Sequence, residues 1–279
     1  MEKGFLAEGL FSGAAMEANN KSSFNIFRLE PRSYMILSVV LILGGWCLLS
    51  FSGRVNPIYL PSPWDVAKAF VSLLEEGVLV PYTLASLYRV LVGFLVAAAL
   101  AIPLGIVMAT SKRAEAFFEP FIDFVRYLPV TALIPLMILY FGIGDFEKVA
   151  VIFVGTFFQL VLMVQDTVSA VPGELLHAAY TLGARGGAVY TRVILPASLP
   201  GIMDSLRICM GWAWTYLVVA ELVAANSGLG FMILRSQRFL QTDRIFVGLL
   251  VIGLLGVATD YLFKTLSRIL FPWYERLGH

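Results

Sequence analysis

Charged side chains are scarce in this sequence. Only 14% of its 279 residues are Asp, Glu, Lys or Arg, against about 25% in an average soluble protein. Hydrophobic residues make up 59% of the chain, and the mean hydropathy is +0.83. A soluble fold of this length could not keep so much apolar surface out of water. The composition therefore predicts an integral membrane protein.

Cysteine and histidine are also rare. Cys47 and Cys209 both lie in apolar runs, which is typical of small buried hydrophobic residues rather than of a disulfide or metal pair. The two histidines, His177 and His279, are too few for a His/Cys metal cluster. The net charge of +1 offers no basic surface for nucleic acid. We expect no metal site and no nucleic-acid partner.

Nucleotide-binding and catalytic motifs are missing. A phosphate-binding loop needs a glycine-rich turn followed directly by lysine, and no lysine here follows a glycine. Gly228-Leu229-Gly230 lacks the third glycine of a dinucleotide fingerprint. Neither Gly-x-Ser-x-Gly nor His-Glu-x-x-His occurs. We therefore expect no enzyme activity and no cofactor bound by this chain. If ATP drives the protein, ATP and Mg bind to partner subunits.

What the chain does have is long apolar runs. A membrane-spanning helix needs about 20 mostly apolar residues, and the runs lack the alternation of barrel strands. Pro129 and Pro135 weaken the third run as a helix. The sequence predicts an all-α membrane protein with six transmembrane helices, at 34–52, 83–109, 117–141, 147–170, 199–225 and 245–271.

The loops between the runs differ in Lys and Arg content. More of these residues fall on the side of the N-terminus, which is typical of the cytoplasmic side. Both termini are thus predicted to be cytoplasmic. The predicted domains are an N-terminal tail at 1–33, a transmembrane domain at 34–272 and a C-terminal tail at 273–279. On the outer side, Ser62-Pro63 favours the start of a short helix that ends at Gly77.

One cytoplasmic stretch is too polar to cross a bilayer. It reads HAAYTLGARGGAVYTRVILP, residues 177 to 196. Good helix formers precede Gly183, which permits a sharp turn, and Leu195-Pro196 is expected to end a second short helix. Small side chains let another backbone approach closely, so the stretch suits docking in a partner's groove.

The spacing of this stretch resembles the EAA loop of permease subunits in bacterial ABC importers. That loop reads Glu-Ala-Ala, three residues, Gly, nine residues and Ile-x-Leu-Pro. Here Ala178-Ala179 and Gly183 occupy the corresponding positions, and Val193 begins Val-Ile-Leu-Pro. Val193 stands where Ile is usual. His177 stands where Glu is usual, so a salt bridge from the Glu position to the ATPase is not expected.

Further segments resemble the branch that imports nitrate, taurine, alkanesulfonates or bicarbonate. The resemblance covers about residues 57 to 272. The segments are Leu60-Pro61-Ser62-Pro63, Ser86-Leu87-Tyr88-Arg89-Val90, Phe141-Gly142-Ile143-Gly144 and Ser227-Gly228-Leu229-Gly230.

The resemblance implies the type I importer fold and a bacterial inner-membrane location. Its partners would be a second permease copy in a homodimer, two ATPase subunits, an extracytoplasmic solute-binding protein and the lipid bilayer. A coupling helix at about 174–182, between the fourth and fifth transmembrane helices, would seat in the ATPase. The residues expected to couple to it are Glu174, His177, Ala178, Ala179, Leu182, Gly183 and Ala184.

Polar residues within the runs are candidates for a substrate pathway, because ionisable groups in a membrane usually face a cavity or the bundle interior. Arg126 could attract an anion, pair with Asp123 or extend to the inner surface. Glu221 could pair with Arg89, as a gate or as a structural ion pair. Gln159 is expected to join helices. The candidate pathway residues are Arg126, Tyr127, Thr131, Trp212, Tyr216 and Glu221.

Two functions follow as hypotheses. The first is the permease of an ATP-driven importer for a small solute, an anion such as nitrate, bicarbonate, taurine or an alkanesulfonate. The alternative is a stand-alone secondary transporter or channel driven by an ion gradient. Such carriers often show internal repeats and paired broken helices; here one proline-broken run and no convincing repeat are visible.

Overall fold

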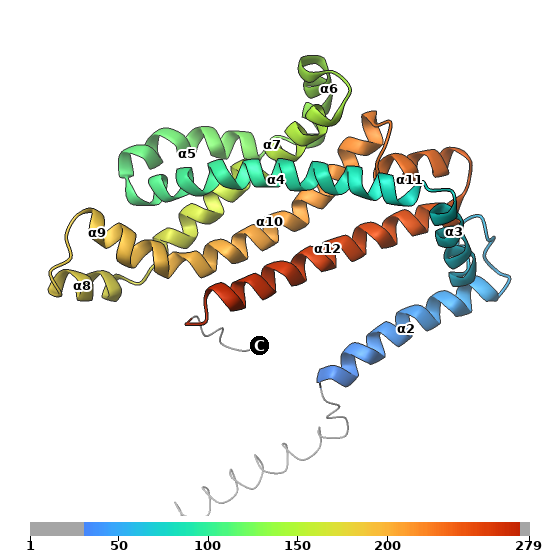
Figure 1. Ribbon diagram of the computed structural model, residues 1–279, viewed down its shortest axis with the longest axis horizontal. Coiled ribbons are helices and arrows are strands. Elements are labelled where there is room, and N and C mark those ends of the chain that lie inside the picture. Colours follow the sequence, from blue (N-terminus) through green and yellow to red (C-terminus); the bar gives the residue numbers. More distant parts are fainter. Residues whose placement is uncertain (1–30, 274–279) are drawn as a thin grey trace, which may run out of the picture. The chain divides into compact units, whose positions relative to one another are not determined.

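The computed structural model describes residues 31–273, and each regular element within that range is a helix (Figure 1). The chain separates into two units, residues 1–63 and 64–279. Residues 1–30 and 274–279, which carry most of the two predicted tails, lie outside the described residues. The all-helical fold predicted from the sequence is confirmed for the part of the chain that the structure covers.

The first unit contains α2 (Pro31–Phe51). Its apolar part, Ile36–Phe51, is shorter than the about 20 residues of a typical span. The indole nitrogen of Trp46 donates a hydrogen bond to the carbonyl oxygen of Pro61 at 3.0 Å. This contact ties the segment after α2 back to the helix.

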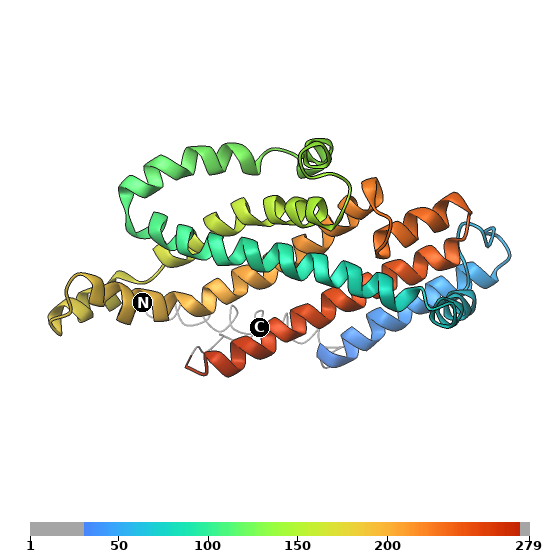
Figure 2. The ribbon, with the colours of Figure 1, turned by 45° about the horizontal axis from the view of Figure 1, so that its top comes forward.

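The core of the second unit consists of three long helices packed against one another, α4 (Leu79–Thr110), α7 (Asp145–Ser169) and α10 (Leu195–Ala224), with α12 (Thr242–Leu270) beside α10 (Figure 2). Glycine allows the close approach of α4 and α7. A Cβ at Gly105 would lie 2.7 Å from the Val161 carbonyl oxygen. The buried side chains of this core include Val90, Phe94, Ala101, Leu160, Val161, Val164, Cys209 and Leu217.

Four helical segments of the described chain are long and apolar enough to cross a membrane. They correspond to the predicted runs at 83–109, 147–170, 199–225 and 245–271. A bent helix pair adds a fifth span if the pair is taken as one. The predicted count of six spans is therefore not confirmed.

The predicted third span at 117–141 contains a sharp break near Pro129, one of the two prolines expected to weaken it. The chain forms α5 (Lys112–Arg126) and α6 (Val130–Phe141), which are bent by 97° relative to each other. Pro129 has no N–H to bond the carbonyl of Val125 and disfavours helical geometry at the residue before it. The helix must therefore end shortly before Pro129.

Two shorter helices lie at the end of this unit opposite to α8 (Gly173–Thr181) (Figure 1). They are α3 (Pro63–Glu75) and α11 (Leu229–Arg238). The predicted helix start at Ser62-Pro63 is confirmed, and Gly77, with a φ of +68°, follows the end of α3.

Candidate functional site

The segment predicted to dock a partner forms a separate helix, α8 (Gly173–Thr181), beyond the end of α7 (Figure 1). Most of its predicted contact side chains are exposed, and Leu182 keeps 88% of its surface open. Ala179 is buried. The exposed members of the predicted set are Glu174, His177, Ala178, Leu182 and Gly183, while Ala184 is partly buried.

Gly183 ends α8 in a specific turn. Its φ is +84°. The N–H of Ala184 donates to the Ala179 carbonyl and that of Gly183 to the Tyr180 carbonyl, both at 3.0 Å. This is the Schellman arrangement, which usually has glycine at the left-handed position. Nothing lies within 4 Å of a Cβ added at Gly183, so the turn requires glycine for its backbone and not for space.

The prediction that Leu195-Pro196 ends a second short helix is wrong. After α9 (Gly187–Val189), a π-helical turn η1 (Tyr190–Ile194) leads directly into α10. The Leu195 N–H donates to the carbonyl of Tyr190, five residues back. Proline is tolerated in a first helical turn, and we attribute its acceptance here to the wider turn before it, which relieves the clash of the ring with the preceding carbonyls.

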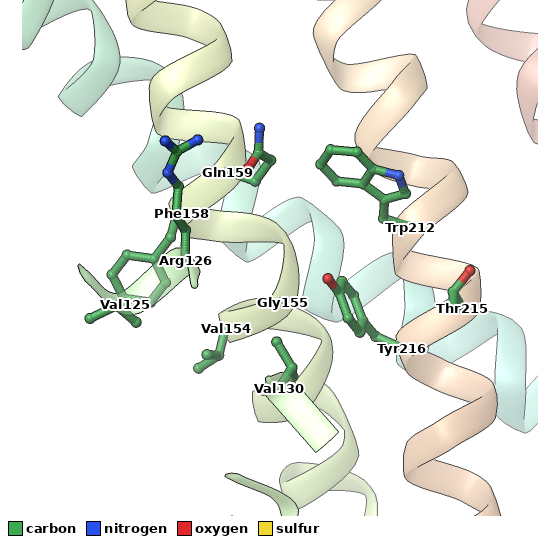
Figure 3. A pocket seen from close by; sticks show the side chains of 10 residues that line it. All are labelled: Val125, Arg126, Val130, Val154, Gly155, Phe158, Gln159, Trp212, Thr215 and Tyr216. Carbon is green, nitrogen blue, oxygen red and sulfur yellow. The ribbon is translucent and has the colours of Figure 1, made fainter. Parts of the chain in front are cut away.

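A polar pocket of about 220 Å³ lies among α5, the first turn of α6, α7 and α10 (Figure 3). Arg126 enters it from the end of α5, Gln159 from α7, and Trp212 and Tyr216 from successive turns of α10. The remaining lining residues are Val125, Val130, Val154, Gly155, Phe158 and Thr215.

Arg126 is held by its own helix end. Its Nε lies 2.9 Å from an Asp123 carboxylate oxygen, and its Nη2 donates to the Tyr127 hydroxyl at 3.0 Å. The guanidinium carbon also lies 4.7 Å from the Tyr127 ring centroid. The predicted pairing with Asp123 is confirmed, and it coexists with exposure of Arg126 to the pocket. Tyr127 and Thr131 are exposed and do not line this pocket.

Glu221 belongs to a different cluster, at the end of the unit near α11. Arg89 Nη1 lies 2.5 Å from its carboxylate, which confirms the predicted pair. Two further partners of Arg89 were not predicted. Its Nη2 lies 2.6 Å from Asp145, and its Nη1 donates to the Ser227 carbonyl at 2.7 Å. Three segments that are distant in sequence thus meet at one guanidinium.

The Glu221 carboxylate is fully buried and fully hydrogen-bonded. The Ser86 hydroxyl donates to it at 2.8 Å and the Gly230 N–H at 2.8 Å. Ser86 in turn accepts a bond from the Leu229 N–H at 2.9 Å. Burying a carboxylate is costly unless its lone pairs are satisfied. The cluster therefore fixes the first turn of α11 against α4 and α10.

A second ion pair lies at the same end. Arg244, in the first turn of α12, donates to both carboxylate oxygens of Glu76, at 3.1 and 2.6 Å. Hydrogen bonds from Arg244 and then from Ser72 lower the pKa of Glu76 below its ordinary value. Across residues 31–273, no group of three or more His, Cys, Asp or Glu side chains is placed to hold a metal ion.

Comparison with known proteins identifies the family. Residues 101–275 match the model for the binding-protein-dependent transport system inner membrane component. The chain belongs to this family. The permease resemblance seen in the sequence is therefore confirmed, and so is the sulfonate and taurine branch.

Relatives match this permease over most of its length. A probable ABC transporter permease protein of Brucella abortus is 41% identical over 89% of this chain and 98% of the relative. The putative aliphatic sulfonates transport permease SsuC of Bacillus subtilis is 34% identical, covering 85% and 86%. The taurine transport system permease TauC of Escherichia coli is 32% identical, covering 85% and 88%.

Solved structures show the same fold. A chain of the MetNI methionine ABC transporter in an inward-facing conformation superimposes with a TM-score of 0.63. It is 18% identical, and the match covers 70% of this permease and 97% of that chain. The type I importer fold predicted for the permease is confirmed.

Proposed function

We propose that this permease is the membrane subunit of an ATP-driven importer, and that α8 couples it to an ATPase. The observation that supports this proposal is the exposed helix α8 with its Gly183 turn. Ala178 and Gly183 are exposed and carry little or no side chain, which lets a partner backbone approach closely. The chain contains no phosphate-binding loop of its own, so ATP and Mg bind to the partner.

In this mechanism α8 transmits the motion of the ATPase. Ala178 and Gly183 offer little side chain and permit close docking. Leu182, with 88% of its surface exposed, provides the apolar anchor, because burial of one leucine is worth about 1.5–3 kcal/mol. Glu174 and His177 contact the rim of the groove, while Ala179 and Ala184 hold the turn.

We propose a small anion as the solute. The named relatives of the branch transport aliphatic sulfonates and taurine. Arg126, Trp212 and Tyr216 meet at one pocket, which places a guanidinium within the bundle. Taurine or an alkanesulfonate is the first choice, with nitrate and bicarbonate next.

The assembly we propose has two permease copies and two ATPase subunits. The α8 end faces the cytoplasm and both termini lie on that side, as the distribution of Lys and Arg predicts. The α11 end then faces the solute-binding protein. The Arg89–Glu221 cluster would stand at this outer end of the pathway, as part of the gate.

The alternative function is a carrier driven by an ion gradient. Such a protein has no use for an exposed docking helix, so the two functions differ in whether an ATPase binds α8. Purification of the permease from the membranes of its own source cell, with the eluate tested for a bound ATPase subunit, distinguishes them.

Three variants sharpen this test. Gly183→Val places a β-branched residue at a φ of +84°, which costs roughly 1–2 kcal/mol, while Gly183→Asn keeps a residue that tolerates this region. Gly77→Val is the matched control, because Gly77 has a φ of +68° and open space around it at the far end of the unit. We expect loss of the ATPase from Gly183→Val alone. Absence of ATPase from the wild type refutes the importer proposal.

A further inference from the structure

We propose that the pocket between α5, α7 and α10 is a preformed subsite for one oxyanionic head group of a small solute, such as a sulfonate. The inference rests on the proposed function, since it places the solute inside the permease. Arg126 supplies the charge, Gln159 and Tyr216 supply hydrogen bonds, and Gly155 sets the available space (Figure 3).

Polar groups without partners distinguish this pocket. Within the described residues, the side chains of Gln159 and Tyr216 and the indole N–H of Trp212 make no hydrogen bond to protein. Each of these groups lies on a helix that is long and apolar enough to cross a membrane. A polar group without a partner is costly in a bilayer unless it faces a water-filled cavity. These groups are therefore free to exchange water for a ligand.

Arg126 keeps unused donors toward such a ligand. Asp123 engages Nε and the Tyr127 hydroxyl engages Nη2, while Nη1 has no partner in residues 31–273. A guanidinium carries five N–H donors in a planar fork that matches two oxygens of an oxyanion. The Tyr127 ring at 4.7 Å and the Asp123 carboxylate fix the plane of the fork, so less side-chain entropy is lost on binding.

The dimensions of the pocket restrict the ligand. Its volume of about 220 Å³ falls below the roughly 300–1,000 Å³ of pockets that take drug-sized ligands. Valines at 125, 130 and 154 and Phe158 form its apolar wall. A head group with a short alkyl chain satisfies both the polar and the apolar surfaces.

Gly155 controls this volume through Tyr216. The Tyr216 ring packs directly on Gly155, so that a Cβ at this position would lie 2.4 Å from the ring atom Cδ2. Even alanine at 155 must displace the ring. The hydroxyl of Tyr216 then moves relative to Arg126 and Gln159, and the pocket changes shape without loss of a polar group.

Direct binding to the intact complex tests the proposal. The permease with its ATPase subunits is placed in lipid nanodiscs and titrated calorimetrically with methanesulfonate. Dimethyl sulfone is the matched probe, because it has nearly the same shape and no charge. We expect methanesulfonate to bind and dimethyl sulfone to bind at least about tenfold more weakly, since hydrogen bonds to a charged partner are the stronger ones.

Two variants of pocket residues and one control variant test whether methanesulfonate binds in this pocket. Arg126→Gln should weaken methanesulfonate binding by about tenfold or more, because it removes a charged hydrogen-bond donor. Gly155→Ala should also weaken binding, because it displaces the Tyr216 ring. Arg207→Gln is the matched control, because Arg207 is also a helical arginine that pairs with an aspartate, Asp260, at 3.7 Å, outside the pocket. It should bind like the wild type.

Two results overturn the proposal. One is a wild-type complex that does not bind methanesulfonate, which makes the pocket a hydrated space between helices. The other is equal binding by Arg126→Gln and Arg207→Gln. Neither result affects the importer function, because ATPase retention by α8 is measured separately on the same preparations.

Discussion

Arg89 and Glu221, 132 positions apart in the chain, form an ion pair with Nη1 2.5 Å from Oε1. Both side chains are almost completely buried. The pair holds α4 and α10 together at the end of the unit near α11, and the same guanidinium donates to the Ser227 carbonyl, which brings in the turn before α11. It is the main polar connection between these segments in the described structure.

Removing the charge of Glu221 should destabilise the permease markedly. Removing one partner of a buried ion pair lowers the free energy of unfolding by about 3–5 kcal/mol. For Glu221→Gln we expect a loss at the lower end of this range, because Asp145 still contacts Arg89. Thermal unfolding in detergent measures the effect. Asp260→Asn is the control, because its partly exposed pairs with Lys264 and Arg207 are worth at most about 1 kcal/mol each. Equal midpoints for the two variants would contradict the structural role of the cluster.

Gly228 should not accept alanine. A Cβ there would lie 2.2 Å from the Glu221 carboxylate, and the φ is +112°. Gly142 also has a positive φ, +72°, with open space around it, so Gly142→Ala carries only the backbone penalty. We expect Gly228→Ala to lower the unfolding temperature well beyond Gly142→Ala. Similar values for both would show that the carboxylate can move away.

The approach of α4 to α7 gives a second comparison of glycines. Gly105→Ala would force a methyl group to within 2.7 Å of the Val161 carbonyl, and overpacking of this kind costs about 1–3 kcal/mol. Gly211→Ala, in α10 with nothing within 4 Å, should be neutral or stabilise by about 0.5–1 kcal/mol. Thermal unfolding of both variants checks the opposite signs. Two destabilised variants would indicate that a partner helix covers Gly211.

The Glu76–Arg244 pair should show a pH dependence. The folded-state pKa of Glu76 is lowered, so the pair stabilises the protein above the ordinary pKa of 4.5, and this contribution is lost as the pH falls through the folded value. The wild type should unfold at a higher temperature than Glu76→Gln at pH 7, and the difference should shrink below pH 4.5. A constant difference would assign the effect to packing.

Helical spans and the docking segment were predictable because their signals are local. Long apolar runs predicted the four segments that are long and apolar enough to cross a membrane. The spacing between Ala178-Ala179 and Gly183 predicted α8 and the turn that follows it. The sequence predicted a weakened helix at Pro129. The angle of 97° between α5 and α6 was not predictable, because it depends on how these two helices pack. The π-helical turn before Pro196 leaves no comparable signal in the sequence.

The candidate sites were predictable only in part, because they depend on contacts between distant segments. Arg126, Trp212 and Tyr216 were selected as polar residues in apolar runs, and they meet in one pocket. Gln159 was expected to join helices, and it lines the pocket instead. Ser86 and Ser227 begin two of the segments that carried the family resemblance, but they have no charge, so their contacts in the Arg89–Glu221 cluster were not predicted.

Uptake by the purified complex in proteoliposomes tests the central claim most directly. The permease, its ATPase and its solute-binding protein are reconstituted together, and uptake of labelled taurine is measured with and without ATP on the ATPase side. We predict uptake that requires ATP, persists when ionophores remove ion gradients and is lost in Gly183→Val. Uptake that continues without ATP and stops when the ion gradient is removed would contradict the importer account.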